Sequence, residues 1–132
     1  MVLSVIDTLI TDRDINTFYN ASDLNRVGEA IQYIADKIYA LGYEIHVSPK
    51  TDWIEADIPL PNQMTHYLED LRTIRAVLTQ PQRTPPVPPD MEQLLYTEAN
   101  DIETMLSITD SLIEWMVSIF YFTGDLFAGE VT

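Results

Sequence analysis

The stretch LLYTEANDIETMLSITDSLIEWMVSIFYF, residues Leu94–Phe122, decides the fold of this chain. Its apolar residues recur at spacings of three, four and seven, which is the pattern of one helix face. They are Ala99, Ile102, Leu106, Ile113, Met116 and Phe120. With Thr97 as N-cap and Thr123–Asp125 as the stop, the helix would be about 39 Å long. As the longest element, it should be the one on which the rest of the chain packs.

Two shorter helices are predicted before it. The first begins at Ser22 or Asp23 as N-cap and ends at Gly42 as a C′ residue. The second starts at or near Pro61, which suits the first helical position. Their apolar faces comprise Leu24, Val27, Ile31, Ile34, Ile38 and Leu41 in the first, and Met64, Tyr67, Leu68, Leu71, Ile74 and Leu78 in the second.

The connectors are predicted to be extended. Tyr43–Val47 alternates apolar and polar residues and could form a short β-ribbon, while Trp53 follows a turn that places it on the helices. The five prolines between Pro81 and Pro89 favour a stiff polyproline-II segment. We therefore predict a mainly α fold, a three-helix bundle with extended proline-rich connectors. Up-down-up packing is the simplest arrangement.

The chain is expected to be a single domain, since it has 132 residues. It divides into an N-terminal apolar segment and loop, residues 1–20, and a helical domain, residues 21–132. The apolar start Met1–Ile10 lacks the basic region of a signal peptide, and no stretch is long enough to span a membrane. We expect synthesis in the cytoplasm and no membrane association.

Charge excludes one class of partner. The formal net charge is −14, and every Lys and Arg lies at or before Arg83. Such a surface repels nucleic-acid phosphates, so we expect no nucleic-acid binding. The acids either keep a small domain soluble or form a docking face for a basic partner. Arg72, Arg75 and Arg83 either pair with the acidic third helix or are ordinary surface arginines.

No pattern indicates catalysis or a cofactor. The two histidines, His46 and His66, are isolated, and the chain has no cysteine. The acidic group Glu98–Glu103 opens a helix, where acids are favoured by the helix dipole alone. There is no phosphate-binding glycine loop and no serine in a nucleophile elbow. We predict a protein that is not an enzyme and that binds no metal or cofactor.

Apolar residues at both ends of the chain are the candidate protein-contact residues. Aromatic residues crowd the end of the third helix, and some must fall off its core face. Coverage of these residues by the chain itself is the alternative. The candidates are Val2, Val5, Ile6, Leu9, Tyr121, Phe122, Leu126 and Phe127.

Several stretches resemble a family of structural tail-module proteins encoded in phages and prophages of Firmicutes. They cover most of the chain from about Ile10 onward. They are Asp23–Ala30, Ser48–Trp53, Thr84–Pro88, Glu98–Glu103 and Gly124–Glu130. No functional residue is carried over from the family.

The resemblance implies a structural protein of the phage virion, made in the bacterial host cytoplasm and placed in the tail tip or baseplate. It would act through contacts with other tail or baseplate proteins and form a homo-oligomer. The charge of −14 supports an alternative function, an acidic DNA mimic that inhibits a host nuclease or restriction enzyme.

Overall fold

The computed structural model describes residues 5–14, 19–91 and 94–131, with residues 120–131 described by their backbone alone. Its elements are a short 3-10 helix η1 (Val5–Thr8) and the helices α1 (Ala21–Ala40), α2 (Pro61–Val77) and α3 (Tyr96–Val131). The prediction of a mainly α, three-helix fold is confirmed. Within the described ranges there is no strand, and Tyr43–Val47 is extended chain rather than part of a β-ribbon.

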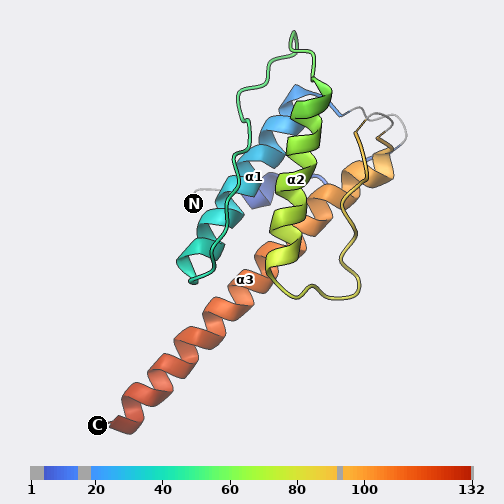
Figure 1. The fold of residues 1–132 in the computed structure, drawn as a ribbon. Coiled ribbons are helices and arrows are strands. Elements are labelled where there is room, and N and C mark those ends of the chain that lie inside the picture. Colours follow the sequence, from blue (N-terminus) through green and yellow to red (C-terminus); the bar gives the residue numbers. More distant parts are fainter. Residues whose placement is uncertain (1–4, 15–18, 92–93, 132) are drawn as a thin grey trace.

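All three helices begin at the same end of the bundle and run in the same general direction (Figure 1). The contacts between α1 and α3 agree, because Arg26 and Glu103 pair near the two starts and Lys37 and Asp110 pair further along both helices. The predicted up-down-up packing is therefore wrong. Its physical reason lies in the connectors, described over residues 41–60 and 78–91. Extended chain covers about twice the distance per residue of a helix, so each connector can return toward the starting end.

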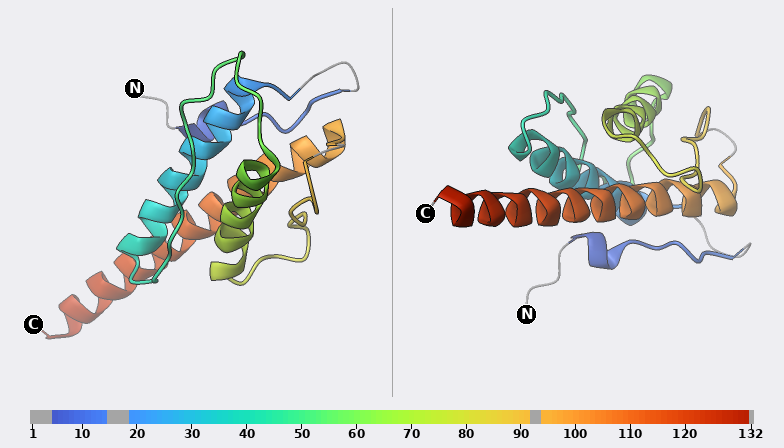
Figure 2. Two further views of the ribbon diagram at one scale, coloured as in Figure 1. Left: turned by 45° about the horizontal axis from the view of Figure 1, so that its top comes forward. Right: turned by 90° about the horizontal axis from the view of Figure 1, so that it is seen from below.

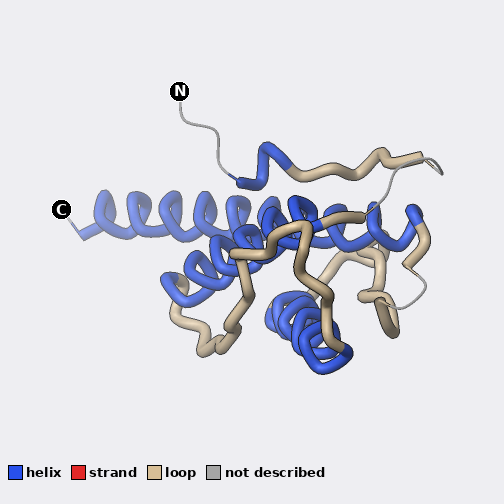
Figure 3. Tube along the Cα trace, turned by 90° about the horizontal axis from the view of Figure 1, so that it is seen from above, coloured by secondary structure: helices blue, strands red, loops and turns tan. Residues whose placement is uncertain are grey.

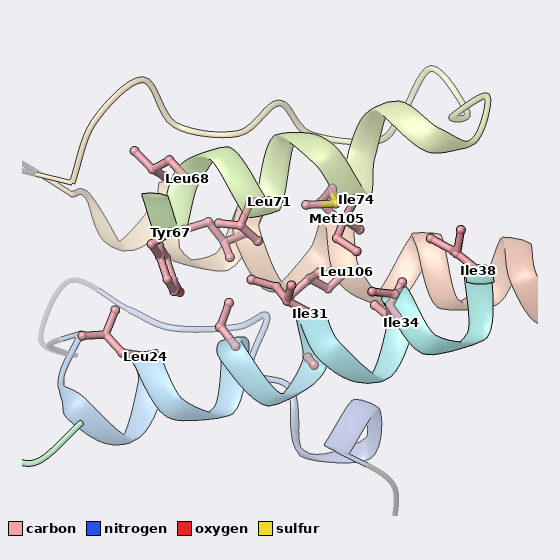
Figure 4. Close-up of a cluster of buried hydrophobic side chains, with 14 of the residues drawn as sticks. Leu24, Ile31, Ile34, Ile38, Tyr67, Leu68, Leu71, Ile74, Met105 and Leu106 are labelled. Carbon is pink, nitrogen blue, oxygen red and sulfur yellow. The ribbon is translucent and has the colours of Figure 1, made fainter. Parts of the chain in front are cut away.

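Helix α3 forms the middle of the molecule. The N-terminal segment 5–14 lies on one side of it, and α1 and α2 lie on the other (Figures 2 and 3). The core consists mainly of aliphatic side chains that face one another across the three helices (Figure 4). Fully buried members include Ile31, Ile34, Ile38, Leu71, Ile74, Ile102, Met105, Leu106 and Ile113. The predicted apolar faces of α1 and α2 are confirmed, with Met64 and Leu41 at the partly buried margin.

The connector 41–60 is held against α1 by two residues of that helix. Asn25 donates from Nδ2 to the Trp53 carbonyl oxygen at 2.8 Å and accepts from the Trp53 N–H at 2.7 Å. A Cβ on Gly28 would lie 2.7 Å from the Lys50 carbonyl oxygen, so the backbones meet too closely for any side chain there. These contacts fix Trp53, which is buried as predicted. Gly42 ends the helix with φ +100°, also as predicted.

The second connector, described over residues 78–91, is held by arginines of α2. Arg75 donates from Nε to the Pro85 carbonyl oxygen at 2.9 Å, and Arg72 donates from Nη2 to that of Pro88 at 3.2 Å. A proline-rich segment offers many carbonyl acceptors and few N–H donors, which suits arginine. Of the two alternatives left open for these arginines, pairing with described acids of the third helix is not seen, because Arg72 and Arg75 instead donate to connector carbonyls.

Helix ends differ from the sequence prediction at three places. Asn20, not Ser22 or Asp23, caps α1, because its side chain accepts from the Ser22 and Asp23 N–H groups while Asp23 completes the capping box. Helix α3 begins one residue before Thr97. It also continues past Gly124 to Val131, because Gly124 and Gly129 each cost a helix only about 1 kcal/mol and no proline follows them.

Among the described residues, no helix is long and apolar enough to cross a membrane.

Replacing Gly28 by alanine tests the close approach of α1 and the connector. We expect Gly28→Ala to lower the free energy of unfolding by about 1–3 kcal/mol, because overpacking outweighs the better helix propensity of alanine. Urea unfolding followed by circular dichroism measures it, with the exposed Glu29→Ala as control. A Gly28→Ala protein as stable as the parent would contradict the contact.

Candidate functional site

A buried cluster of four charges joins the N-terminal segment, α1 and α3. Arg13 donates from Nη2 to Asp23 Oδ1 at 2.9 Å and also pairs with Glu103. Arg26 donates from Nε to Glu103 Oε1 at 2.7 Å and also pairs with Asp23. Glu103 is fully buried. Two cations and two anions in alternation leave the cluster neutral, which is the condition under which ionised groups are tolerated in a core.

Backbone contacts complete the cluster. The Ile10 N–H donates to Glu103 Oε1 at 3.1 Å, and Asn100 both accepts from the Arg13 N–H at 2.8 Å and donates to the Arg13 carbonyl oxygen at 3.1 Å. The Arg13 guanidinium also lies 5.3 Å from the ring centre of Tyr19. The segment 5–14 is thus fixed along α3 by polar contacts. This role of Glu103 was not predicted from the sequence, where its position near the start of a helix was explained by the helix dipole alone.

Asp23 keeps its charge inside this cluster. Burial raises the pKa of its carboxyl, but hydrogen bonds from the Asn20 N–H and from Arg26 and Arg13 outweigh burial and hold the pKa below its ordinary value of 3.8. Asp70 on α2 behaves in the opposite way, because burial raises its pKa and the nearby His66 compensates in part.

A second ion pair holds α1 on α3 further along. Lys37 Nζ donates to Asp110 Oδ1 at 2.8 Å and also pairs with Glu114. These pairs place Lys37 at the margin of the contact between α1 and α3, with its side chain 23% exposed. Glu114 is the last charged residue of α3 before Asp125.

The C-terminal part of α3 leaves the bundle and projects alone (Figures 1 and 2). Leu112 and Met116 still pack against the core, whereas large apolar side chains beside and beyond them are exposed. Trp115 is 64% exposed, Val117 43% and Ile119 39%. From Val117 to Val131 the helix extends by about 22 Å at 1.5 Å per residue. We name Trp115–Gly124, which carries no charged residue, the projecting segment.

An apolar groove lies at the opposite end of the bundle, where the helices begin. It encloses about 730 Å³. Leu24 of α1 and Leu68 of α2 lie at this end of the core (Figure 4). Among the described residues, Arg72 and Asp90 are the charged ones that line it. The remaining lining residues are Tyr19, Pro59, Pro61, Met64, Thr65, Pro89, Met91 and Leu94.

Only some of the predicted contact residues have described side chains. Val5, Ile6 and Leu9 are partly buried against the chain's own core. Val2 lies outside the described residues, and so do the side chains of Tyr121, Phe122, Leu126 and Phe127, whose backbone belongs to α3. Trp115, Val117 and Ile119 were not among the predicted contacts, although the charge-free run after Glu114 is a signal that would have found them.

Each of the two histidines lies beside a single carboxylate. His66 Nε2 lies 2.8 Å from Ser48 Oγ and 3.3 Å from Asp70 Oδ2, beside a small cavity of about 270 Å³ that Trp53 and Tyr67 also line. His46 is exposed and lies 3.2 Å from Glu44. In the part of the chain that the structure describes, no three His, Asp or Glu residues are grouped so as to hold a metal ion.

Comparison with known proteins found no matching family model, no matching curated protein and no matching solved structure.

Removing the charge of Glu103 tests whether the buried cluster holds the fold. We expect Glu103→Gln to lower the free energy of unfolding by about 3–5 kcal/mol, because Arg13 and Arg26 lose the carboxylate that both contact. The matched control on α3 is Glu114→Gln, whose ion pair is largely exposed and is worth about 1 kcal/mol or less. Denaturant unfolding measures both variants. If Glu103→Gln and Glu114→Gln lost the same free energy of unfolding, the buried cluster would not hold the fold more strongly than the exposed ion pair.

Asp23 also predicts a dependence on pH. Because its folded pKa lies below 3.8, its stabilising contribution is present above that value and is lost as the pH falls through the folded pKa. We expect Asp23→Asn to be less stable than the parent at pH 7 and to lose less stability on acidification. Asp70→Asn should instead gain stability at pH 7, because its folded pKa is raised. Thermal unfolding between pH 7 and pH 3 measures both effects. The expectation would be contradicted if Asp23→Asn and Asp70→Asn shifted the unfolding temperature at pH 7 in the same direction relative to the parent.

Proposed function

We propose that this chain is a structural protein of a phage virion, in the tail tip or baseplate, and that it acts through protein–protein contacts. The projecting segment of α3 is the proposed contact with a neighbouring subunit. The function requires no catalysis, metal or cofactor. The observation that carries the proposal is the lone helix with exposed Trp115, Val117 and Ile119.

Exposed apolar side chains on a projecting helix favour a role in assembly. A helix that is apolar around its circumference is normally buried, and contiguous apolar surface on a monomer marks an interaction site. Tryptophan is also among the residues that contribute most to binding at protein interfaces. Candidate contact residues lie at both ends of the chain. At the N-terminal end, Val5, Ile6 and Leu9 already pack on the core, whereas the apolar side chains of α3 named above are exposed. The contact is therefore assigned to α3.

The phage part of the proposal is supported by the sequence resemblance. The resembling stretches contain the residues that tie this fold together: Asn25 and Gly28 meet the stretch that ends at Trp53, and Arg26 meets Glu103. Such residues favour a shared architecture. The assignment to a virion rests on the structural tail-module proteins that these stretches resemble.

Mass spectrometry of gradient-purified particles from a lysogen that encodes the chain tests the proposal. We expect its peptides at a fixed ratio to the tail proteins. Trp115→Glu should remove the chain from particles without unfolding it, because the side chain is exposed and its proposed partner surface is apolar. The matched control is Tyr39→Glu, which replaces an aromatic residue on α1 that is 71% exposed and should leave incorporation unchanged. Particles that lack the parent chain while the infected cells contain it would refute the virion assignment.

The acidic DNA mimic is the second candidate, and one observation favours it. Arg13, Arg26, Lys37 and Lys50 are all engaged in ion pairs within the chain, so they offset acids internally. The remaining acids leave the surface polyanionic, as a DNA mimic requires. Protection of DNA from a panel of restriction enzymes by the purified chain would support this function, and cleavage at the normal rate would remove it.

A further inference from the structure

The small cavity between the connector 41–60 and α2 has a buried floor and an exposed rim. It encloses about 270 Å³. Of the residues that line it, Trp53, Tyr67 and Asp70 are buried and form the floor, whereas Lys50 and Asn62 are exposed and lie at the rim. The volume is close to the lower limit of sites that bind small molecules. The cavity therefore suits one small ring rather than a folded partner.

Two polar atoms of the floor residues have no hydrogen-bond partner among the described residues. They are Nε1 of Trp53, which can only donate, and Oδ2 of Asp70, which accepts. Trp53 is 6% exposed and Asp70 4%. A buried polar group without a partner costs stability, so nearly all such groups in proteins are paired. A donor and an acceptor left free in the lining of one cavity indicate a ligand that binds there.

The side chains next to these two atoms do not satisfy them. His66 Nε2 lies 3.3 Å from Asp70 Oδ2, but it is closer to Ser48, 2.8 Å from Oγ and 3.1 Å from the carbonyl oxygen. The Lys50 ammonium lies over the ring of Trp53, 5.1 Å from the ring centre. An ammonium has no acceptor for the indole N–H. Both floor groups are thus fixed by the fold and remain available to a ligand.

The two free groups together restrict the chemistry of the ligand. Trp53 requires an acceptor, and the carboxylate of Asp70 requires a donor. An ammonium or guanidinium ligand offers only donors and would leave Trp53 unpaired. A carboxylate or phosphate ligand offers only acceptors and would leave Asp70 unpaired. The ligand is therefore uncharged and carries groups that both donate and accept, which are hydroxyl or amide groups.

The rest of the lining favours a hydroxylated ring over an amide. The rings of Pro49, Trp53 and Tyr67 add apolar surface to the cavity, and the side-chain amides of Asn62 and Gln63 add donors and acceptors. A sugar ring has C–H groups on its faces and hydroxyl groups around its edge, so it meets both kinds of surface at once. A peptide amide continues as chain in two directions, which a cavity of this size does not enclose.

We propose that this cavity binds one uncharged monosaccharide unit, with Trp53 Nε1 donating to a sugar oxygen and Asp70 Oδ2 accepting from a sugar hydroxyl. The site is separate from the projecting segment, and the proposal does not rest on the proposed function. A binding role also explains why α2 carries a buried carboxyl whose pKa is raised by burial, since such groups cost stability and are frequent at functional sites.

The indole N–H signal of Trp53 in a proton–nitrogen NMR correlation spectrum of the full chain tests the proposal. The chain has two tryptophans, and Trp115→Phe, a change of an exposed side chain, identifies the Trp53 signal. The probes are the methyl glycosides of glucose, galactose, mannose and N-acetylglucosamine, with N-methylacetamide as the amide probe. We expect at least one sugar to shift the Trp53 signal saturably, with a Kd of about 1 mM, and to leave the Trp115 signal unchanged.

Asp70→Asn separates binding from folding. We expect it to weaken sugar binding about tenfold or more, because the hydrogen bond to a charged acceptor is lost, while circular dichroism shows a folded protein. The matched control is Glu69→Gln, which changes the adjacent exposed acid outside the cavity and should bind as the parent does.

Three results would overturn the proposal. The first is a Trp53 signal that none of the sugars shifts saturably. The second is equal sugar binding by the parent and Asp70→Asn. The third is a saturable shift with N-methylacetamide and with no sugar, which would assign the cavity to an amide ligand instead.

Discussion

The fold depends on the pairing of Glu103 with Arg13 and Arg26 in the interior of the molecule. A fully buried carboxylate is costly unless its charge is matched, so the two guanidinium groups must reach it. Arg26 brings the start of α1 to the start of α3, and Arg13 brings the N-terminal segment to the other side of α3. One residue of the central helix thereby fixes the position of two other segments.

The same pairing fixes the direction of the helices. With their starts joined at Glu103 and Lys37 paired with Asp110 further along, α1 and α3 must run side by side in one direction. The extended connectors then return along the helices, and Asn25, Gly28 and Arg75 hold them there. Because α3 is longer than α1 and α2, it alone continues beyond the bundle. The projecting segment and the groove at the other end follow from this geometry.

The sequence predicted the features that local patterns determine. The apolar faces of α1 and α2, the C′ glycine Gly42 and the start of α2 at Pro61 all depend on neighbouring residues and are confirmed. The burial of Glu103 and the direction of the helices depend on partners far away in the sequence, such as Arg13, and no periodicity reports them. Of the candidate site, the sequence indicated apolar chain ends, but it did not distinguish Leu9, which packs on the core, from Trp115, which remains exposed.

The pairing of Glu103 with Arg13 and Arg26 is tested most directly by a double-mutant cycle in denaturant unfolding at pH 7. The cycle compares the parent with Arg13→Met, Glu103→Gln and the double variant. Because the two side chains contact each other in the interior, we expect the double variant to lose about 0.5–3 kcal/mol less free energy of unfolding than the two single losses added together. Losses that simply add would contradict a direct pairing of the N-terminal segment with α3.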